Sequence, residues 1–264
     1  MTRDAIIKTA DMFTETDFNI LKVESALSPD LTGLRFFDAP ILAFGAASDP
    51  MFVEFQDPRI IGTLFKPPSF WLKNAKSVIS FFLPFTKAVR DSNYDDIHEP
   101  SPRWYHARVE GQEFVIALCR HLEKFLADSG HNSVIPAIDS RFCEEFDGSR
   151  FQSSWSERHT AYICGLGTFG LSAGIITEQG MAGRLGSIVT DAEFTADSRP
   201  YDDAFGYCIR CNACISRCPA GAITPEGMDK ALCSERFEET KRKHKTWYRC
   251  GKCQVRVPCE SRRP

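Results

Sequence analysis

Residues 208–219 read CIRCNACISRCP, and this stretch decides how the rest of the chain is interpreted. Its cysteines follow the pattern C-x2-C-x2-C-x3-C-P, which ends at Cys218 and Pro219. The spacing is typical of a loop that binds cubane iron–sulfur clusters, because thiolates three residues apart on a tight loop can point at one centre. The fourth cysteine is displaced by one residue and followed by proline, so it turns away and serves the other cluster in two-cluster proteins.

Four cysteines downstream supply a second set of ligands, and eight thiolates suit two [4Fe-4S] clusters. Tetrahedral zinc is the alternative, but zinc sites normally use two separated C-x2-C pairs rather than three cysteines at successive spacings of three. By the crossed pattern of two-cluster proteins, we expect one cluster on Cys208, Cys211, Cys214 and Cys259, and the other on Cys218, Cys233, Cys250 and Cys253.

The cysteines are concentrated in one segment, since eight of the eleven lie between Cys208 and Cys259. In a reducing compartment such a local set binds metal more often than it forms disulfides. The N-terminus has neither an apolar signal segment nor a twin-arginine pair, and no stretch is apolar enough to span a membrane. We therefore expect a cytoplasmic protein without membrane association. The other three cysteines are interpreted as small buried hydrophobic residues: Cys119, Cys143 and Cys164.

Composition excludes a disordered or collagen-like chain, because the 264 residues are 43% hydrophobic and 25% charged, with a net charge of −3. Charge divides the chain: residues 1–200 carry 19 basic and 27 acidic residues, whereas residues 201–264 carry 13 basic and 8 acidic ones. Together with the cysteines, this predicts a boundary near Pro200. Residues 1–200 would form a cofactor and substrate domain, and residues 201–264 a ferredoxin-like domain with two [4Fe-4S] clusters.

The N-terminal part carries the strand and helix patterns of an α+β protein. The apolar run at 77–85 predicts a strand, and apolar residues at helical spacing over 108–127 predict a long amphipathic helix. We further expect a strand at 133–138, a helix over 154–164, and β-rich stretches at 174–177 and 186–190.

Residues 165–170, GLGTFG, spell G-x-G-x-x-G, and Asp191 lies about where a ribose-binding acid would stand. A dinucleotide site needs a strand before this turn and a helix after it. Here a predicted helix precedes the turn, and four glycines between residues 174 and 186 break any helix that follows. We interpret the segment as a tight turn that permits close backbone approach, for packing or for a ligand. Its candidate cofactor-binding residues are Gly165, Leu166, Gly167 and Gly170.

Asp139 follows the apolar segment VIPAI, so its carboxyl group stands at a strand end that can face a cleft. In such a place the pKa of the carboxyl group can be raised enough for general acid catalysis. From the residues alone, a helix or turn cap is the better interpretation, because this is a common role of aspartate at such a position.

These features together resemble the epoxyqueuosine reductases and, more distantly, the catalytic part of the reductive dehalogenases. The resemblance covers roughly residues 70–260, and the order of the eight cysteines is its strongest part. Its other elements are AKSVISFFLPF at 75–85, Ile138-Asp139-Ser140, and Glu157-Arg158 ahead of the glycine turn.

The resemblance implies a nitroreductase-like α+β domain that holds cobalamin, followed by a bacterial two-cluster ferredoxin-like domain that feeds it electrons. It also implies that low-valent cobalt acts on the substrate and that Asp139 donates the proton. This sequence has extra residues around 141–150, and it ends five residues after Cys259, where epoxyqueuosine reductases carry a further helical-repeat domain that helps hold tRNA. We therefore expect a small organic substrate rather than tRNA.

The basic segment KRKHK at 241–245, with Trp247 and Tyr248, has the composition of a nucleic-acid contact through phosphates and stacking. In a chain of net charge −3, one short patch is more often a solvated face or a docking site for an acidic redox partner. The second interpretation is favoured. It fits a low-potential electron donor of the ferredoxin or flavodoxin type.

The leading hypothesis is a cytoplasmic iron–sulfur oxidoreductase whose two clusters pass electrons to cobalamin for reduction of an organic substrate. Cluster potentials extend to about −700 mV, so strongly reducing electrons are available. Two alternatives stay open: a non-catalytic ferredoxin-type electron carrier or corrinoid-handling protein, and a flavin-dependent iron–sulfur reductase. The sequence lacks a cobalt-ligating D-x-H-x-x-G motif, and nitroreductase-like domains bind flavins, which keeps the flavin alternative in place.

Overall fold

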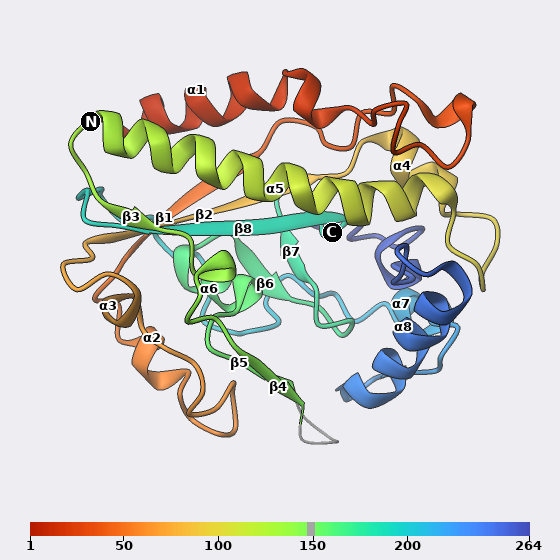
Figure 1. Cartoon of the computed structure of the whole chain (residues 1–264). Helices are drawn as coiled ribbons and strands as arrows, with labels where there is room; N and C mark the ends of the chain where they lie inside the picture. The colour runs from red at the N-terminus through yellow and green to blue at the C-terminus, as the bar shows by residue number, and fades with distance from the viewer. Residues whose placement is uncertain (147–150) are drawn as a thin grey trace.

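A computed structural model describes residues 1–146 and 151–264 and shows a mixed fold of helices and strands (Figure 1). The helices are α1 (Arg3–Thr14), α2 (Met51–Glu54), α3 (Pro68–Trp71), α4 (Lys87–Ser92), α5 (Pro102–Asp128), α6 (Glu157–Cys164), α7 (Ala213–Ser216) and α8 (Lys230–His244). The strands are β1 (Ile41–Ala46), β2 (Ser77–Pro84), β3 (Ser133–Val134), β4 (Glu144–Phe146), β5 (Phe151–Ser153), β6 (Gly167–Phe169), β7 (Ile175–Thr177), β8 (Gly183–Thr190), β9 (Ile223–Thr224) and β10 (Gly227–Met228).

The main sheet has four antiparallel strands in the order β1-β2-β8-β3. Every residue of β2 is buried, because helices cover both faces of the sheet. Alternate side chains of β2 enter different cores, as strand geometry requires. Ile79, Phe81 and Leu83 belong to the core under α1 and α5. Val78 and Phe82 belong to the core on the opposite face, which α6 shares with α2 and α3.

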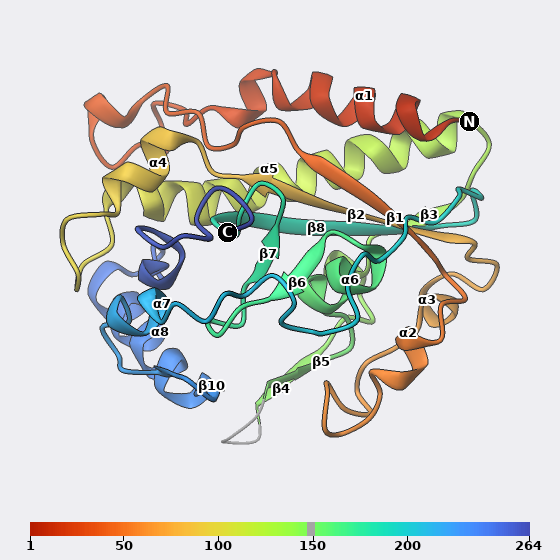
Figure 2. The ribbon, with the colours of Figure 1, turned by 180° about the vertical axis from the view of Figure 1, so that it is seen from behind.

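Helix α5 is the longest element, and it lies with α1 across one face of the sheet (Figure 1). It begins six residues before the predicted start because Ser101 caps it: the Ser101 hydroxyl accepts a hydrogen bond from Trp104 N at 3.1 Å, and Pro102 occupies the first turn. The apolar stripe places Phe114, Leu118 and Leu122 in the core. The first turns of α5 therefore reach the end of the sheet where the cysteine-rich segment packs (Figure 2).

Several predicted elements are confirmed and two are corrected. The strand at 77–85 corresponds to β2, and the β-rich stretches at 174–177 and 186–190 correspond to β7 and β8. The strand at 133–138 is only two residues long, because Pro136 has no N–H for the ladder and begins a 3-10 turn. The helix over 154–164 begins at Glu157. The extra residues around 141–150 include β4 of the β4–β5 hairpin, and positions 147–150 lie outside the described residues.

The cysteine-rich segment docks on one end of the main sheet (Figure 2). The backbone oxygen of Glu260 accepts from Ala182 N at 3.0 Å, and its carboxylate accepts from Tyr94 Oη at 2.6 Å and Arg90 Nε at 3.1 Å. The buried ammonium of Lys252 donates to Asn93 O and Oδ1 at 3.1 and 2.8 Å. The division near Pro200 stays a prediction, and these bonds hold the parts on either side of it together.

Two of the three isolated cysteines are buried as predicted. Cys119 lies in the core under α5, and Cys164 lies in the core beside α6. The prediction is wrong for Cys143, which is exposed because it lies just ahead of the β4–β5 hairpin rather than in a core-facing element. Among the described residues, no helix has the length and apolar character to cross a membrane.

We predict that Leu118→Ala lowers the free energy of unfolding by about 2–5 kcal/mol, because Leu118 is fully buried under α5 and the truncation leaves a cavity. Arg120→Ala is the control on the exposed side of the same helix and should change stability by less than about 0.5 kcal/mol. Urea unfolding followed by circular dichroism under anaerobic conditions measures both. Equal midpoints for the two variants would contradict the core assignment.

Candidate functional site

The structure brings the eight cysteines of the predicted clusters together in two groups of four, each of which lines one cavity. We call these the first and second cysteine cavities. The first is small, about 20 Å³, and the second is about 100 Å³. The first is lined by Cys208, Cys211, Cys214 and Cys259, and the second by Cys218, Cys233, Cys250 and Cys253. These are the two sets that the crossed pattern predicts; their role as ligands remains a prediction.

Burial makes the thiolate form of these cysteines costly on its own. It raises the pKa of Cys233 to about 11 and that of Cys259 to about 12, and it raises the pKa values of Cys250 and Cys253 as well. Neighbouring cysteines of the same set add to each shift. Thiolates packed in this way need a cationic centre, and iron supplies one, so the residues present fit two clusters. Among the described residues, no three His, Cys, Asp or Glu side chains form a group suited to a single metal ion.

The second cysteine cavity is positioned by the start of α5. Gly251 has a φ of +61°, and a Cβ atom there would stand 1.9 Å from the indole of Trp104, so only glycine permits this contact. The neighbouring Lys252 is anchored to Asn93 in the loop that precedes α5. The Cys250–Cys253 pair is thereby fixed against the α+β layer rather than left on a free loop.

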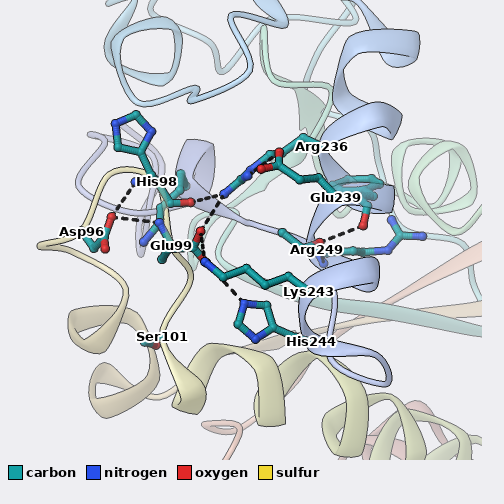
Figure 3. A network of polar contacts seen from close by, with 12 residues as sticks. Asp96, His98, Glu99, Ser101, Arg236, Glu239, Lys243, His244 and Arg249 are labelled. Carbon is teal, nitrogen blue, oxygen red and sulfur yellow. Dashed lines mark hydrogen bonds and ion pairs between the residues drawn. The ribbon is translucent and has the colours of Figure 1, made fainter.

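Helix α8, which carries Cys233, is held by a network of charged groups (Figure 3). Glu99 accepts from Lys243 Nζ at 2.8 Å and lies 3.3 Å from His244 Nε2 and 3.8 Å from Arg236. The Lys243 ammonium is the main reason that the pKa of Glu99 lies below its usual value. Asp96 shapes the loop by accepting from the backbone N–H groups of residues 98 and 99. Part of the basic segment 241–245 therefore has a structural partner inside the chain.

A larger cavity of about 310 Å³, which we call the central cavity, lies between α5, β8 and the start of α6. It shares part of its wall with the second cysteine cavity: Arg108, Arg158, Gly183, Arg184, Arg249 and Gln254. It also shares Ser156 and Arg158 with a lateral cavity of about 580 Å³ that extends toward β5. The three cavities form a chain from the cysteines to the surface.

Four arginines and one glutamate give the central cavity its charge. The arginines come from α5, α6, β8 and the segment before Cys250: Arg108, Arg158, Arg184 and Arg249. The Arg158 side chain is exposed and lies in the cavity wall. The carboxylate oxygens of Glu157 are buried, and this burial raises the pKa of its carboxyl group to about 7, partly offset by the Ser187 hydroxyl and the Arg184 guanidinium. At neutral pH it is therefore a half-protonated acid inside the cavity.

Sequence reasoning did not select the arginines, and it used Glu157 and Arg158 only as elements of a resemblance. The arginines are separated by up to 141 positions, between residues 108 and 249, and no local motif joins them. A signal was available only for Glu157, an acidic residue in the first turn of α6 directly after Ser156.

The expectation of a raised pKa for Asp139 is wrong in this structure. Its carboxylate accepts from Arg141 Nε and Nη2 at 2.8 Å each and from Arg141 N at 2.9 Å. The hydrogen bonds from the Arg141 side chain lower the pKa of Asp139. The same guanidinium is tied to the backbone oxygens of residues 70 and 71, so it holds the Asp139 carboxylate near α3. Ile138 lines the central cavity, whereas Asp139 is not among its lining residues.

The glycine turn is explained mainly by packing. Gly165 ends α6 with a φ of +95°, Leu166 is buried in the core beside α6, and a Cβ atom on Gly167 would stand 2.0 Å from the backbone oxygen of Ile176. None of these three lines the central, lateral or second cysteine cavity. Gly170 lines the first cysteine cavity. The turn thus brings β6 onto β7 and leaves its end beside the first cysteine set.

Comparison with known proteins adds a family match to this geometry. Residues 205–224 match the 4Fe-4S binding domain family, which covers the first cysteine run. No curated protein matches the chain by sequence.

Solved structures with a similar fold include epoxyqueuosine reductases and a reductive dehalogenase. An epoxyqueuosine reductase bound to an epoxyqueuosine-modified tRNA-Tyr stem loop has a TM-score of 0.55 and 18% identity, covering 98% of this chain and 65% of its own. The enzyme from Streptococcus thermophilus has a TM-score of 0.50 and 17% identity, covering 100% and 68%. The catabolic reductive dehalogenase NpRdhA with 3-bromo-4-hydroxybenzoic acid has a TM-score of 0.51 and 14% identity, covering 98% and 36%.

At these identities the likeness shows the fold. The chain spans about two thirds of the length of the epoxyqueuosine reductases (65–68%) and about a third of the dehalogenase (36%). The fold resemblance predicted from the cysteines and the central strand is therefore confirmed.

We predict that the carboxyl group of Glu157 titrates near pH 7 in the folded protein, because burial favours its neutral form. Difference infrared spectroscopy should show a protonated carboxyl band that is present at pH 6 and lost by pH 8. The band should be absent from Glu157→Gln and unchanged in Asp139→Asn, because the pKa of Asp139 is lowered. A band that survives Glu157→Gln would assign the titration to another carboxyl group.

Proposed function

We propose that this chain is an iron–sulfur reductase that passes electrons from two [4Fe-4S] clusters to a cofactor in the central cavity for reduction of a small organic substrate. One observation carries the proposal: the second cysteine cavity and the central cavity share a wall. Electrons on a cluster held by the second cysteine set would lie directly beside the cavity. A protein that only carried electrons would not need a cavity at that point.

The proposed ligands are the two crossed sets. Cys208, Cys211, Cys214 and Cys259, the outer set, would hold the outer cluster in the first cysteine cavity. The four cysteines of the second cysteine cavity, the inner set, would hold the inner cluster. Cys211 is exposed, and the neighbouring side chain of Ile209 is 58% exposed. The outer cluster is therefore the entry point for electrons from a low-potential donor of the ferredoxin or flavodoxin type. Cys214 lies on α7, which packs against the turn Lys252–Gln254 that carries Cys253 of the inner set. Electrons would pass from the outer cluster to the inner one across this packing.

Cobalamin is the cofactor we propose for the central cavity. A reductive dehalogenase structure with this fold is described as suggesting a mechanism for B12-dependent dehalogenation, and it has 15% identity and a TM-score of 0.50. The central and lateral cavities adjoin, and together they offer room on the scale of a large cofactor. Bound there, low-valent cobalt would supply reducing electrons to an organic substrate. A flavin in the same cavities is the alternative.

We assign the role of proton donor in the reaction to Glu157. Its neutral carboxyl group lines the central cavity, whereas the carboxylate of Asp139, the donor that the resemblance implies, is paired with Arg141. A general acid must hold its proton at working pH, and only Glu157 of these two does so near pH 7. Gly165, Leu166 and Gly167 would act through packing, and Gly170 through its place beside the outer cluster. A small substrate, rather than tRNA or a membrane component, fits a cavity of this volume, and we propose that the reaction takes place in the cytoplasm.

Metal and sulfide analysis tests the proposal on protein purified without oxygen from cells supplied with cobalamin. We predict about eight irons, about eight sulfides and about one cobalt per chain. Eight irons with a bound flavin and no cobalt would indicate that a flavin, rather than cobalamin, is the cofactor. Eight irons with neither cofactor would leave an electron carrier, and zinc without iron would overturn the proposal.

We predict that Cys211→Ala halves the iron content and removes one of two cluster signals in electron paramagnetic resonance spectra of the reduced protein. Cys233→Ala should remove the other signal. Cys143→Ala, an exposed cysteine outside both sets, is the matched control and should leave both signals intact. Retention of both clusters in Cys211→Ala would refute the ligand sets, and circular dichroism separates local cluster loss from unfolding.

A further inference from the structure

The guanidinium groups of the central cavity lack the partners that buried arginines normally have. Among the described residues, none of the four forms an ion pair with a carboxylate within 4 Å. The Nε atoms of Arg108, Arg184 and Arg249 are buried without any hydrogen-bond partner. Unpaired buried charges are expensive, so such a cluster calls for an anion.

Mutual repulsion adds to this cost. Burial and the Arg249 guanidinium lower the pKa of Arg108 to about 10. Burial, followed by Arg108, lowers the pKa of Arg184 as well. A guanidinium nevertheless keeps its charge at neutral pH, so several positive charges face one cavity. Glu157 lines the same cavity, but its carboxyl group is only partly ionised near pH 7, so it does not balance the positive charges of the arginines.

The clusters explain only part of this charge. Arg158 interacts with Cys253 and Cys233, so it offsets the negative charge of the inner cluster ligands. The groups that affect the pKa values of Arg108 and Arg184 are other arginines and Tyr248, and no cysteine is among them. Arg108 and Arg184 line both the second cysteine cavity and the central cavity, and their Nε atoms have no hydrogen-bond partner, so they are available to an anion in the central cavity.

Three of the arginines are also held in place by contacts within the chain. Arg108 lies over the ring of Tyr248 at 5.7 Å, and Arg249 lies over Phe237 at 4.7 Å. Arg249 has a φ of +81°, and its N–H is bonded to Thr240 Oγ1 at 3.1 Å, so its backbone is fixed in an uncommon conformation. Arg184 donates to the side-chain oxygen of Gln112. Planar guanidinium groups fixed in this way suit a carboxylate or phosphate, which they bind through paired hydrogen bonds.

We propose that the central cavity binds an oxyanion through Arg108 and Arg184, and that the organic substrate of this chain carries a carboxylate or phosphate group. Arg158 and Arg249 affect the pKa of Cys233 and so lie near the inner cysteine set. The substrate part of this inference rests on the proposed function, whereas oxyanion binding by the cavity does not. Glu157 lines the same cavity, and in its protonated form it would donate its proton to a bound anionic molecule.

Isothermal titration of inorganic phosphate and of malonate into the anaerobically purified full chain, at constant low ionic strength, tests the site. We expect saturable binding that is about ten- to hundredfold weaker in Arg184→Gln and Arg108→Gln, because each loses a charge-assisted hydrogen bond. Arg120→Gln, on the exposed side of α5, makes the same chemical change and should bind as wild type. Arg184→Lys should be intermediate, because it keeps the charge without the fork.

Absence of saturable binding in the wild-type protein, or equal affinities in all variants, would overturn the site. Iron content and circular dichroism confirm that each variant is folded. A chain that holds iron but binds no anion would refute oxyanion binding and leave the proposed function standing. A chain that binds anions but holds zinc would refute the proposed function and leave oxyanion binding standing.

Two further measurements distinguish two possible anions for this site: a group of the substrate and the phosphodiester of cobalamin. If the substrate is the source, cobalamin-loaded protein still binds phosphate, and cobalamin and cobinamide, which lacks the phosphodiester, are retained equally. Loss of phosphate binding in the loaded protein, together with weak retention of cobinamide, would assign the arginines to the cofactor and overturn the substrate class.

Discussion

The docking of the cysteine-rich segment on the end of the main sheet is the constraint on which the rest of the structure depends. Two buried charges hold it: Lys252 donates to Asn93, and Glu260 accepts from Tyr94 and Arg90. Breaking a buried, paired charge typically costs about 3–5 kcal/mol, so these contacts specify one docking geometry. An apolar interface of equal area would be less specific. The central cavity exists because this geometry places residues 249–254 opposite the start of β8.

If both cysteine sets hold clusters as proposed, the distribution of charge around them would give electron flow a direction. Cluster potentials depend on net charge, hydrogen bonds and solvent exposure. The inner set lies near Arg158 and Arg249, which favour added negative charge and so raise the potential there. The outer set includes the exposed Cys211 and lies beside the apolar residues Leu171, Ile176 and Met181. Electrons that enter at the outer set would therefore move toward the cavity rather than away from it.

The parts of the molecule that sequence reasoning identified are those with local patterns. The apolar run of β2, the capped amphipathic α5 and the spacing of the cysteines each follow from a rule that acts over a few residues. Local rules also caused the errors. Asp139 follows an apolar segment, but the structure pairs it with Arg141, two residues later, and this contact decides its pKa. Cys143 lies just ahead of a hairpin outside the core, where an isolated cysteine stays exposed.

No local sequence pattern marks the residues that line the central cavity, and helix α6 shows the reason. Three consecutive residues at its start serve different sites: Glu157 lines the central cavity, His159 lines the lateral cavity, and Arg158 lines both and also the second cysteine cavity. At a helix N-terminus the macrodipole favours a charged carboxylate, typically by less than about 1 kcal/mol. The rise in the pKa of Glu157 from 4.5 to about 7 corresponds to roughly 3 kcal/mol in the other direction. Burial thus outweighs the dipole and the nearby arginine, and it raises the pKa of a carboxyl group that lies among cations.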